Sequence, residues 1–194
     1  MKERLILASA SSQRKILLEG LGFQFQVVPS DIAEQSCGET HPRRRAQVLA
    51  EMKAQDVAGK HPGTWVIGCD TLVVAEDGTL LEKPEDEHHA RHMLELQSGR
   101  VSVVHSGLAL IAPDSRQCSD VSSSSVSFKE LTSREMDWWI GTGQWRDRSG
   151  GFQIDGRGQL MIAKVEGDWT GVVGLPLFLL GELMRRARAP FIAV

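Results

Sequence analysis

The chain has 194 residues, of which 41% are hydrophobic and 24% are charged, and its 22 Lys and Arg against 25 Asp and Glu give a formal net charge of −3. This length and composition are typical of one globular domain with a sizeable core. The near balance of charge argues against the broad basic surface that binds polymeric nucleic acid. Three cysteines, Cys37, Cys69 and Cys118, lie far apart without a CxxC pair, so the sequence predicts neither a disulfide framework nor a zinc site.

The apolar segments set a further limit. The run that follows the charged residues at the start of the chain is too short for the core of a signal peptide. No stretch approaches the roughly 20 apolar residues that a membrane-spanning helix needs. We therefore expect a cytoplasmic protein without a membrane partner.

Strands and helices are predicted to alternate in the first half of the chain. The expected elements are a buried strand at 5–8, a helix at 13–21 begun by serines and closed by Gly22, a half-buried strand at 23–27, a polar loop at 30–41, a helix at 42–59, and a long extended segment at 65–75 that returns at 80–81. Asp77-Gly78 is the turn signal of that hairpin.

The second half is richer in strands. The expected elements are a helix at 84–96, strands at 101–112 and 122–128, a helix ending at 140 and capped by Thr132 with Glu135, a glycine-rich loop at 150–158, strands at 160–165 and 170–173, and a helix at 176–188. Because strands dominate the stretch from 100 to 130, the pattern predicts an α/β fold with an elongated mixed sheet flanked by helices. The length fits 1–194 as one domain, or as one domain with two lobes.

The first candidate site follows the first strand. Ser9-Ala10-Ser11-Ser12-Gln13-Arg14 offers hydroxyl groups, one guanidinium and the free N–H groups of a helix start, all of which suit phosphate. The same residues also fit an ordinary helix cap with an Arg that faces solvent.

Asp70 is the second candidate, because it interrupts an apolar extended stretch. Burying a carboxylate there costs free energy unless it has a partner, a metal or a catalytic task. The alternative is that Asp70 lies at a strand end and caps a turn. Lys83 would lie near Asp70 if the two strands pair. The two residues would then form either a structural salt bridge or a water-activating carboxylate beside a phosphate-binding ammonium.

The segment 147–156 is the third candidate, since clustered glycines let a backbone approach a ligand. A flexible surface loop is the alternative, and Phe152 with Ile154 favours an anchored loop. Two other charged groups are interpreted as solvated surfaces: the helical histidines His88, His89 and His92, and the basic run Arg43-Arg44-Arg45.

Taken in order, these segments resemble the Maf family of nucleotide pyrophosphatases over nearly the whole chain. The matching motifs are the serine and arginine segment 9–14, Glu34, Lys53, Gly68-Cys69-Asp70-Thr71, Glu82-Lys83-Pro84, Leu96-Gln97-Ser98-Gly99, the glycine loop, and Val172-Val173-Gly174-Leu175-Pro176. The chain departs from the family pattern at three positions, where Ser12 replaces Pro, Gln13 replaces Arg, and Ser102 replaces a frequent His.

The resemblance implies that 1–194 is a single domain with two lobes and a cleft between them. It also implies hydrolysis of a nucleoside triphosphate to the monophosphate and pyrophosphate, with Mg²⁺ or Mn²⁺, by a homodimer. Asp70 would be the general base or would hold the metal together with Glu34. The triphosphate would be neutralised by Ser9, Arg14, Lys53 and Lys83. Such positioning and charge neutralisation are what phosphoryl transfer chiefly requires.

The resemblance also assigns Gln13, Thr71 and Asp155 to base choice. Thr71 is typical of the branch that prefers dTTP and UTP, whereas Asp155 is closer to the branch that prefers 7-methyl-GTP. We lean toward dTTP and UTP, because Gln13 and Thr71 can donate to the carbonyls of uracil and Asp155 can accept from its N–H.

Two other classes of function compete. A non-catalytic nucleotide-binding regulator of cell division would keep the basic residues but would not need Asp70 and Glu34. A Rossmann-type oxidoreductase would show GxGxxG after the first strand, and that motif is missing there. The two acids favour the enzyme.

Overall fold

A computed structural model describes residues 4–191 and shows an α/β fold built on one long mixed sheet. The strands are β1 (Leu5–Leu7), β2 (Gln26–Val27), β3 (Trp65–Val74), β4 (Leu80–Leu81), β5 (Val101–Ile111), β6 (Gln117–Phe128) and β7 (Ile162–Glu166). The α-helices are α1 (Ser12–Gly20), α2 (Pro42–Lys60), α3 (Glu87–Gln97), α4 (Ser133–Gly141), α5 (Trp169–Val173) and α6 (Leu177–Ala187). Short 3-10 helices are η1 (Glu34–Ser36), η2 (Ser149–Gly151) and η3 (Gly156–Met161).

The sheet has the strand order β2-β1-β3-β5-β6-β7, in which β1 runs parallel to β2 and β3 and the other pairings are antiparallel. One edge of β3 is divided between two partners. Its start pairs with β1 at Trp65–Ile67, and its end pairs with β4 at Val73 and Val74. Between these pairings, the edge that contains Asp70 and Thr71 has no strand partner among the described residues, so side chains from loops and helices can reach it.

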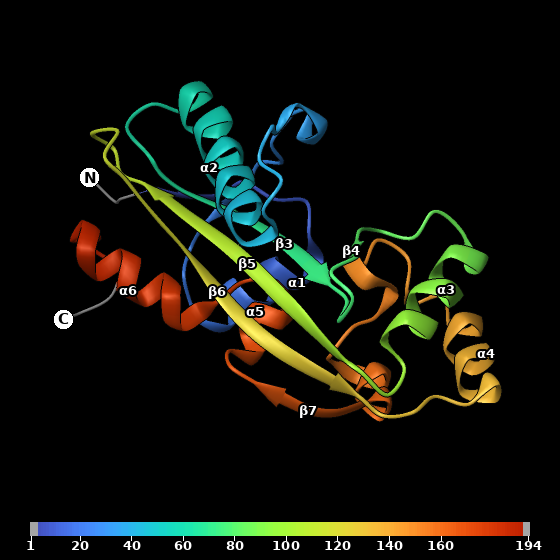
Figure 1. Cartoon of the computed structure of the whole chain (residues 1–194). Helices are drawn as coiled ribbons and strands as arrows, with labels where there is room; N and C mark the ends of the chain where they lie inside the picture. The colour runs from blue at the N-terminus through green and yellow to red at the C-terminus, as the bar shows by residue number, and fades with distance from the viewer. Residues whose placement is uncertain (1–3, 192–194) are drawn as a thin grey trace.

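Helix α2 covers one face of the sheet, and α5 and α6 lie against the other (Figure 1). The approach of α2 is unusually close because the sheet carries glycine where the helix crosses it. A Cβ on Gly107 would lie 2.1 Å from the carbonyl oxygen of Ala46, and a Cβ on Gly68 would lie 2.3 Å from that of Ala50. The helix contributes alanines at these contacts, so small residues on both sides let the backbones meet.

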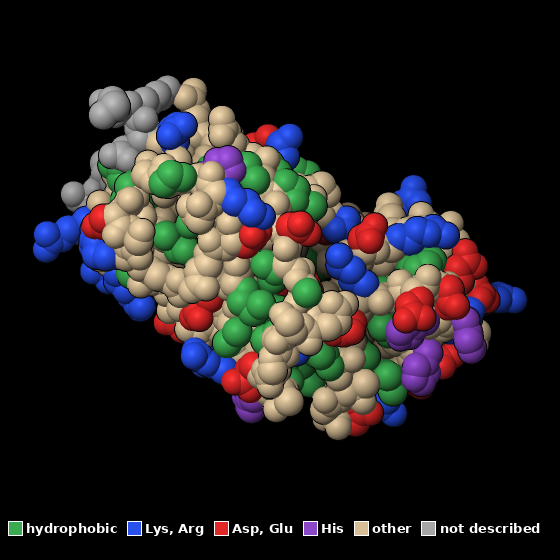
Figure 2. Space-filling view, turned by 90° about the horizontal axis from the view of Figure 1, so that it is seen from above, with side chains coloured by type: hydrophobic (Ala, Val, Ile, Leu, Met, Phe, Trp, Pro, Cys, Tyr) green, Lys and Arg blue, Asp and Glu red, His purple; other side chains and the backbone are tan. Residues whose placement is uncertain are grey.

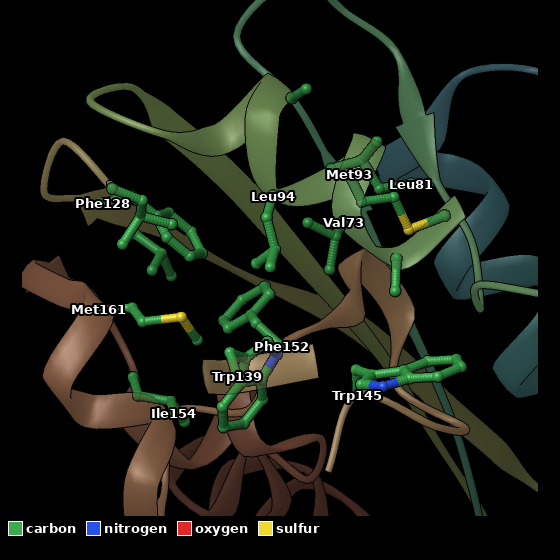
Figure 3. Close-up of a cluster of buried hydrophobic side chains, with 14 of the residues drawn as sticks. Val73, Leu81, Met93, Leu94, Phe128, Trp139, Trp145, Phe152, Ile154 and Met161 are labelled. Atoms are coloured by element: carbon green, nitrogen blue, oxygen red, sulfur yellow. The ribbon is translucent and has the colours of Figure 1, made fainter. Parts of the chain in front are cut away.

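A second group of elements, with α3 and α4, packs at the far end of the sheet (Figure 1). Its core includes the buried side chains of Trp139, Phe152 and Ile154, shown with their neighbours in Figure 3. The rings of Phe128 and Phe152 meet edge to face with centroids 5.0 Å apart, and Trp139 Nε1 donates to the carbonyl oxygen of Gly151 at 2.8 Å. The glycine loop is therefore anchored, as Phe152 and Ile154 indicated.

Most predicted elements are present, and the mixed elongated sheet is confirmed. The strand predicted at 170–173 is wrong, because these residues form α5. Asp168 caps this short helix by accepting from Thr170 N at 2.8 Å, and Gly174, with φ of 128°, ends it. The β-branched residues there gave a strand-like pattern that the local cap overrides.

Several boundaries also differ. The strand predicted at 23–27 is limited to β2, and the strand predicted at 122–128 extends back to Gln117 along β5. The helix predicted from Pro84 begins at Glu87, where Asp86 accepts from His89 N at 2.7 Å. The segment predicted as a strand from 160 starts as η3 and becomes β7 at Ile162. The Thr132 and Glu135 capping box of α4 is confirmed.

Over residues 4–191, no helix has both the length and the apolar character needed to cross a bilayer.

The close approach of α2 generates a stability prediction. We expect Gly107→Ala to lower the free energy of unfolding by about 1–3 kcal/mol, because the new methyl group meets backbone atoms of α2 that cannot move independently. The measurement is urea unfolding followed by circular dichroism. Gly59→Ala is the control, since nothing lies within 4 Å of a Cβ at this exposed position in α2. It should be neutral or stabilising by up to about 1 kcal/mol, and equal effects of the two substitutions would contradict the close contact.

Candidate active site

A cavity with a volume of about 790 Å³ opens at the unpaired edge of β3. Its walls come from the turn between β1 and α1, from η1, α2 and β3, from the segment after β4, and from residues 146–155 and 172–174. Figure 2 shows acidic and basic side chains around a hollow between the larger part of the molecule and the part that contains α3 and α4. All nine side chains predicted for the site line this cavity: Ser9, Gln13, Arg14, Glu34, Lys53, Asp70, Thr71, Lys83 and Asp155.

A buried ion pair lies at the base of the cavity. Asp70 is 5% exposed and Lys53 is 9% exposed, and Lys53 Nζ lies 2.5 Å from Asp70 Oδ1. The same ammonium contacts Glu34 Oε1 at 2.7 Å. Lys53 thus joins the two carboxylates that the sequence analysis linked to catalysis, and it is Lys53 rather than Lys83 that forms an ion pair with Asp70.

The environment of the two carboxylates differs. Partial burial raises the pKa of Glu34, but the hydrogen bond from Lys53 and the charges of Lys53, Lys83 and Arg14 outweigh it, so the pKa lies below its usual value. Glu34 is therefore ionised at neutral pH. Asp70 Oδ2 is buried and has no hydrogen-bond partner. An unpartnered buried carboxylate oxygen is costly, and its place in the cavity makes it the natural acceptor for a water molecule or a cation.

Arg14 is held in position by three hydrogen bonds. Its Nε donates to the carbonyl oxygen of Gly174 at 2.9 Å, Nη1 to Ser9 Oγ at 3.0 Å, and Nη2 to Thr71 Oγ1 at 3.1 Å. Because a guanidinium has five N–H groups, two remain for a ligand. Ser9 Oγ also accepts from Ser11 N at 3.2 Å, so it shapes the turn that leads into α1.

The start of α1 lies beside this arginine. Ser11 is the N-cap residue, and its side chain accepts from the backbone of Arg14. The first turn of α1 contributes N–H groups and the positive end of the helix dipole. Together with Arg14, this turn forms a surface that suits an anionic group.

Two further basic residues line the cavity in different ways. Lys83 is exposed, and no carboxylate of residues 4–191 lies within ion-pair distance of it, so its ammonium is available for an anion. Arg45, which the sequence analysis assigned to a solvated surface, is half-buried instead. Its Nη1 donates to the carbonyl oxygens of Cys37 and Glu39 at 3.0 and 3.2 Å, so it holds the loop that follows η1 and Glu34.

Another part of the cavity wall combines apolar and polar side chains. Phe152 and Ile154 line it together with Gln13, Arg148 and Asp155. Arg148 Nη1 donates to Gln13 Oε1. Burial lowers the pKa of Arg148, and the charges of Asp155 and Asp147 oppose that shift.

Three contributors to this site were not predicted from the sequence. Arg45 belongs to a basic run that was interpreted as a solvated surface, and Arg148 lies in the candidate segment 147–156 but was given no role. The carbonyl oxygen of Gly174, which accepts from both Arg14 and the thiol of Cys69, has no side-chain signal at all. Thr71 is placed in the cavity, but its hydroxyl already bonds to Arg14 and Ser106, so its role in base choice stays a prediction.

The residues fit a divalent cation that is held partly by the protein and partly by the phosphates of a substrate. No group of three His, Cys, Asp or Glu side chains that could hold a metal occurs within the described residues. Mg²⁺ in phosphate-processing sites, however, is commonly held by one or two carboxylates together with substrate phosphates and water. Glu34 and the unpartnered oxygen of Asp70 match that smaller requirement.

Residues 4–187 match the family described as Maf-like protein. The dTTP/UTP pyrophosphatase of Deinococcus radiodurans is 44% identical over 184 residues, which covers 95% of this chain and 93% of the relative. The dTTP/UTP pyrophosphatase of Syntrophotalea carbinolica is 41% identical over 188 residues, covering 95% and 85%. Among solved structures, the Ham1 protein of Staphylococcus aureus aligns with a TM-score of 0.47 and 14% identity, over 65% of this chain and 72% of that one.

The Lys53 ion pair generates a prediction on stability and pH. Lys53→Met leaves Asp70 buried without its partner, so we expect a loss of about 3–5 kcal/mol in the free energy of unfolding at pH 7, measured in urea. The pKa of Glu34 should rise in this variant, as followed by NMR titration. A lowered pKa stabilises the folded state above the unfolded-state pKa, and this contribution is lost as the pH falls through the folded-state pKa. The Glu34 part of the difference from wild type should therefore shrink in acid.

The control is the double variant Lys53→Met with Asp70→Asn. It removes the unpaired charge as well as the lysine, and most of the lost stability should return. A single Lys53→Met variant as stable as the wild type would show that the ion pair is not formed in solution.

Proposed function

The chain belongs to the Maf family, and on that premise we propose that it is a nucleoside triphosphate pyrophosphatase, which hydrolyses its substrate to the monophosphate and pyrophosphate. The observation that carries the proposal is a single cavity that combines the unpartnered oxygen of buried Asp70 with the available cations of Arg14 and Lys83. The ~40% identity to dTTP/UTP pyrophosphatases over 95% of the chain supports it.

The reaction follows from the charges in the cavity. The phosphates would lie between Lys83, the two remaining N–H groups of Arg14 and the start of α1. Asp70 Oδ2 would orient a water molecule and accept its proton as the oxygen attacks the α-phosphorus. The bond from that phosphorus to the oxygen bridging to the β-phosphate would break, and pyrophosphate would leave with the electron pair.

A divalent cation, Mg²⁺ or Mn²⁺, is part of the proposal. Glu34 would hold it together with the phosphates, and the unpartnered oxygen of Asp70 would either bind the ion or act as the general base. Such an ion neutralises phosphate charge and lowers the pKa of a bound water. A cytoplasmic location and a homodimer are further parts of the proposal, and both stay predictions.

For the base, we propose uracil and thymine nucleotides, with 7-methyl-GTP as the competing substrate. Relatives that carry the name dTTP/UTP pyrophosphatase support the first choice. The polar groups that line the cavity beside Phe152 and Ile154 suit the edge of a uracil, in which one N–H lies between two carbonyls. Gln13 can donate to a carbonyl, and Asp155 can accept from the N–H.

A nucleotide-binding regulator of cell division is the alternative. It would use the same cations, but nothing in binding alone requires a buried carboxylate with an unpartnered oxygen, which costs stability. Release of pyrophosphate from mixed nucleoside triphosphates with Mg²⁺ separates the two functions.

The bond that is cut can be tested with labelled water. In H₂¹⁸O, attack at the α-phosphorus places the label in the nucleoside monophosphate and leaves pyrophosphate unlabelled. We expect this result by mass spectrometry with UTP or dTTP. Label in the pyrophosphate, or release of orthophosphate and a nucleoside diphosphate, would contradict the proposed function.

The role of Asp70 can be tested by Asp70→Asn, which keeps the size of the side chain but cannot take up the proton. We expect turnover to fall by about 10²-fold or more, the usual scale for a lost general base, while circular dichroism shows a folded protein. Asp120→Asn is the matched control, because Asp120 is outside the cavity and forms surface ion pairs with Arg43 and Arg186. Turnover of Asp70→Asn close to that of Asp120→Asn would remove Asp70 from the mechanism.

A further inference from the structure

The contact between Arg148 and Gln13 settles the orientation of an amide in the cavity. An arginine side chain only donates hydrogen bonds, so the atom of Gln13 that Arg148 Nη1 contacts must be the oxygen, Oε1. Ser12 Oγ also donates to Oε1, at 3.1 Å. The two donors together occupy the acceptor end of the amide, and the NH₂ group is left to face other partners.

Arg148 itself is placed on a rigid support. Its backbone N–H donates to the carbonyl oxygen of Trp145, and its own carbonyl accepts from Gly151 N. The next residue, Ser149, donates through Oγ to the backbone of Thr71 at 3.3 Å, and Gly150 N donates to the carbonyl oxygen of Glu82 at 3.1 Å. The arginine is therefore fixed relative to β3 and to the segment after β4.

The environment of the Arg148 guanidinium shows that an ion pair is not its main role. The side chain is half-buried, its Nε is buried without a hydrogen-bond partner, and no carboxylate in the described part of the chain lies within ion-pair distance. Within residues 4–191, its one side-chain hydrogen bond goes to the neutral amide of Gln13. A charged donor that is partly desolvated holds its acceptor firmly.

Thr71 cannot donate a hydrogen bond to the base in place of Gln13. Ser106 Oγ donates its hydrogen to the carbonyl oxygen of Gly171 at 2.7 Å, so in the 3.0 Å contact between Thr71 Oγ1 and Ser106 Oγ the hydrogen comes from Thr71. Thr71 Oγ1 accepts in turn from Arg14. The hydrogen of Thr71 is thus already used, and the NH₂ group of Gln13 is the donor that remains among the three predicted base-selecting residues.

We infer that Arg148 is a specificity-determining positioning residue that fixes the Gln13 amide with its NH₂ group toward the base and thereby selects a base with a carbonyl at the recognised edge. The inference rests on the proposed function, since it concerns the base of that substrate. Arg148 would thereby favour uracil and thymine over cytosine, which carries an amino group in place of one carbonyl. For cytosine, Gln13 would have to present its oxygen, and the NH₂ group would then meet the guanidinium of Arg148.

The direct test compares UTP with CTP. We expect Arg148→Met to lower the ratio of kcat/KM for UTP to that for CTP by about tenfold, the size of one neutral hydrogen bond. Without Arg148 the Gln13 amide can rotate and accept from cytosine. Arg146→Met is the matched control, because Arg146 also lines the cavity and carries the same charge but packs over Trp145, with its guanidinium 4.5 Å from the ring centroid. Its ratio should stay at the wild-type value.

A double-mutant cycle distinguishes positioning from a direct contact. In the Gln13→Met background, Arg148→Met should leave the ratio unchanged, because the group through which Arg148 acts is gone. The ratio of the dissociation constants of UMP and CMP, measured by calorimetry on the same variants, gives a second readout that needs no turnover.

The outcomes separate the inference from the proposed function. Equal losses for UTP and CTP in Arg148→Met, or the same change in both backgrounds, would show that Arg148 acts on phosphate or on the base itself and would overturn the inference. A wild-type protein that releases no pyrophosphate from any triphosphate would overturn the proposed function, and the UMP and CMP affinities would still decide the role of Arg148. Thermal unfolding of each variant establishes that it is folded.

Discussion

The close packing of α2 on the sheet is the constraint on which the site depends. Asp70 pairs in register with Gly107 on the neighbouring strand, and the backbone of α2 passes directly over that glycine. Lys53 lies seven residues after Ala46, about two helical turns along the same face of α2, so the contact at Gly107 also sets how far Lys53 stands from Asp70. A side chain at Gly107 would lift the helix and separate the ion pair. The glycines in the middle of these strands, which weaken a sheet in isolation, are therefore explained by the position they give to one lysine.

Strand β3 serves the site on both of its faces because successive side chains alternate. Asp70 points toward α2 and Lys53, whereas its neighbours Cys69 and Thr71 contact Gly174 on the other side. Arg14 reaches Thr71 from α1 and binds the same carbonyl oxygen of Gly174. The division of one edge of β3 between β1 and β4 lets these two sets of contacts meet in one cavity. A strand paired along its full length on this edge would exclude the side chains of α1.

The sheet and the residues that line the candidate site could both be predicted from the sequence, but for different reasons. Apolar runs and turn residues identified β1, β3, β5 and β6 because burial dictates those patterns, and the ordered motifs brought all nine predicted side chains to one cavity. The partners of those side chains could not be predicted, because a hydrogen bond between residues 135 positions apart, such as Arg148 to Gln13, leaves no local pattern. The misassigned α5 shows the converse, since there a side-chain cap outweighed β propensity.

The charges on the cavity wall bear on the proposed need for a divalent ion. Two of the side chains predicted to hold metal or phosphate are negative and three are positive: Glu34, Asp70, Lys53, Arg14 and Lys83. Glu82 and Arg45 also line the cavity and add one charge of each sign, so the sum is unchanged. One net positive charge offsets only part of the charge of a triphosphate, and the low dielectric of a partly buried site makes the remainder costly. Replacing the carboxylates by neutral residues would improve this balance, yet the chain keeps one of them buried with an unpartnered oxygen. That arrangement favours a substrate that binds together with a divalent cation. The cation would then be a partner for the carboxylates as well as for the phosphates.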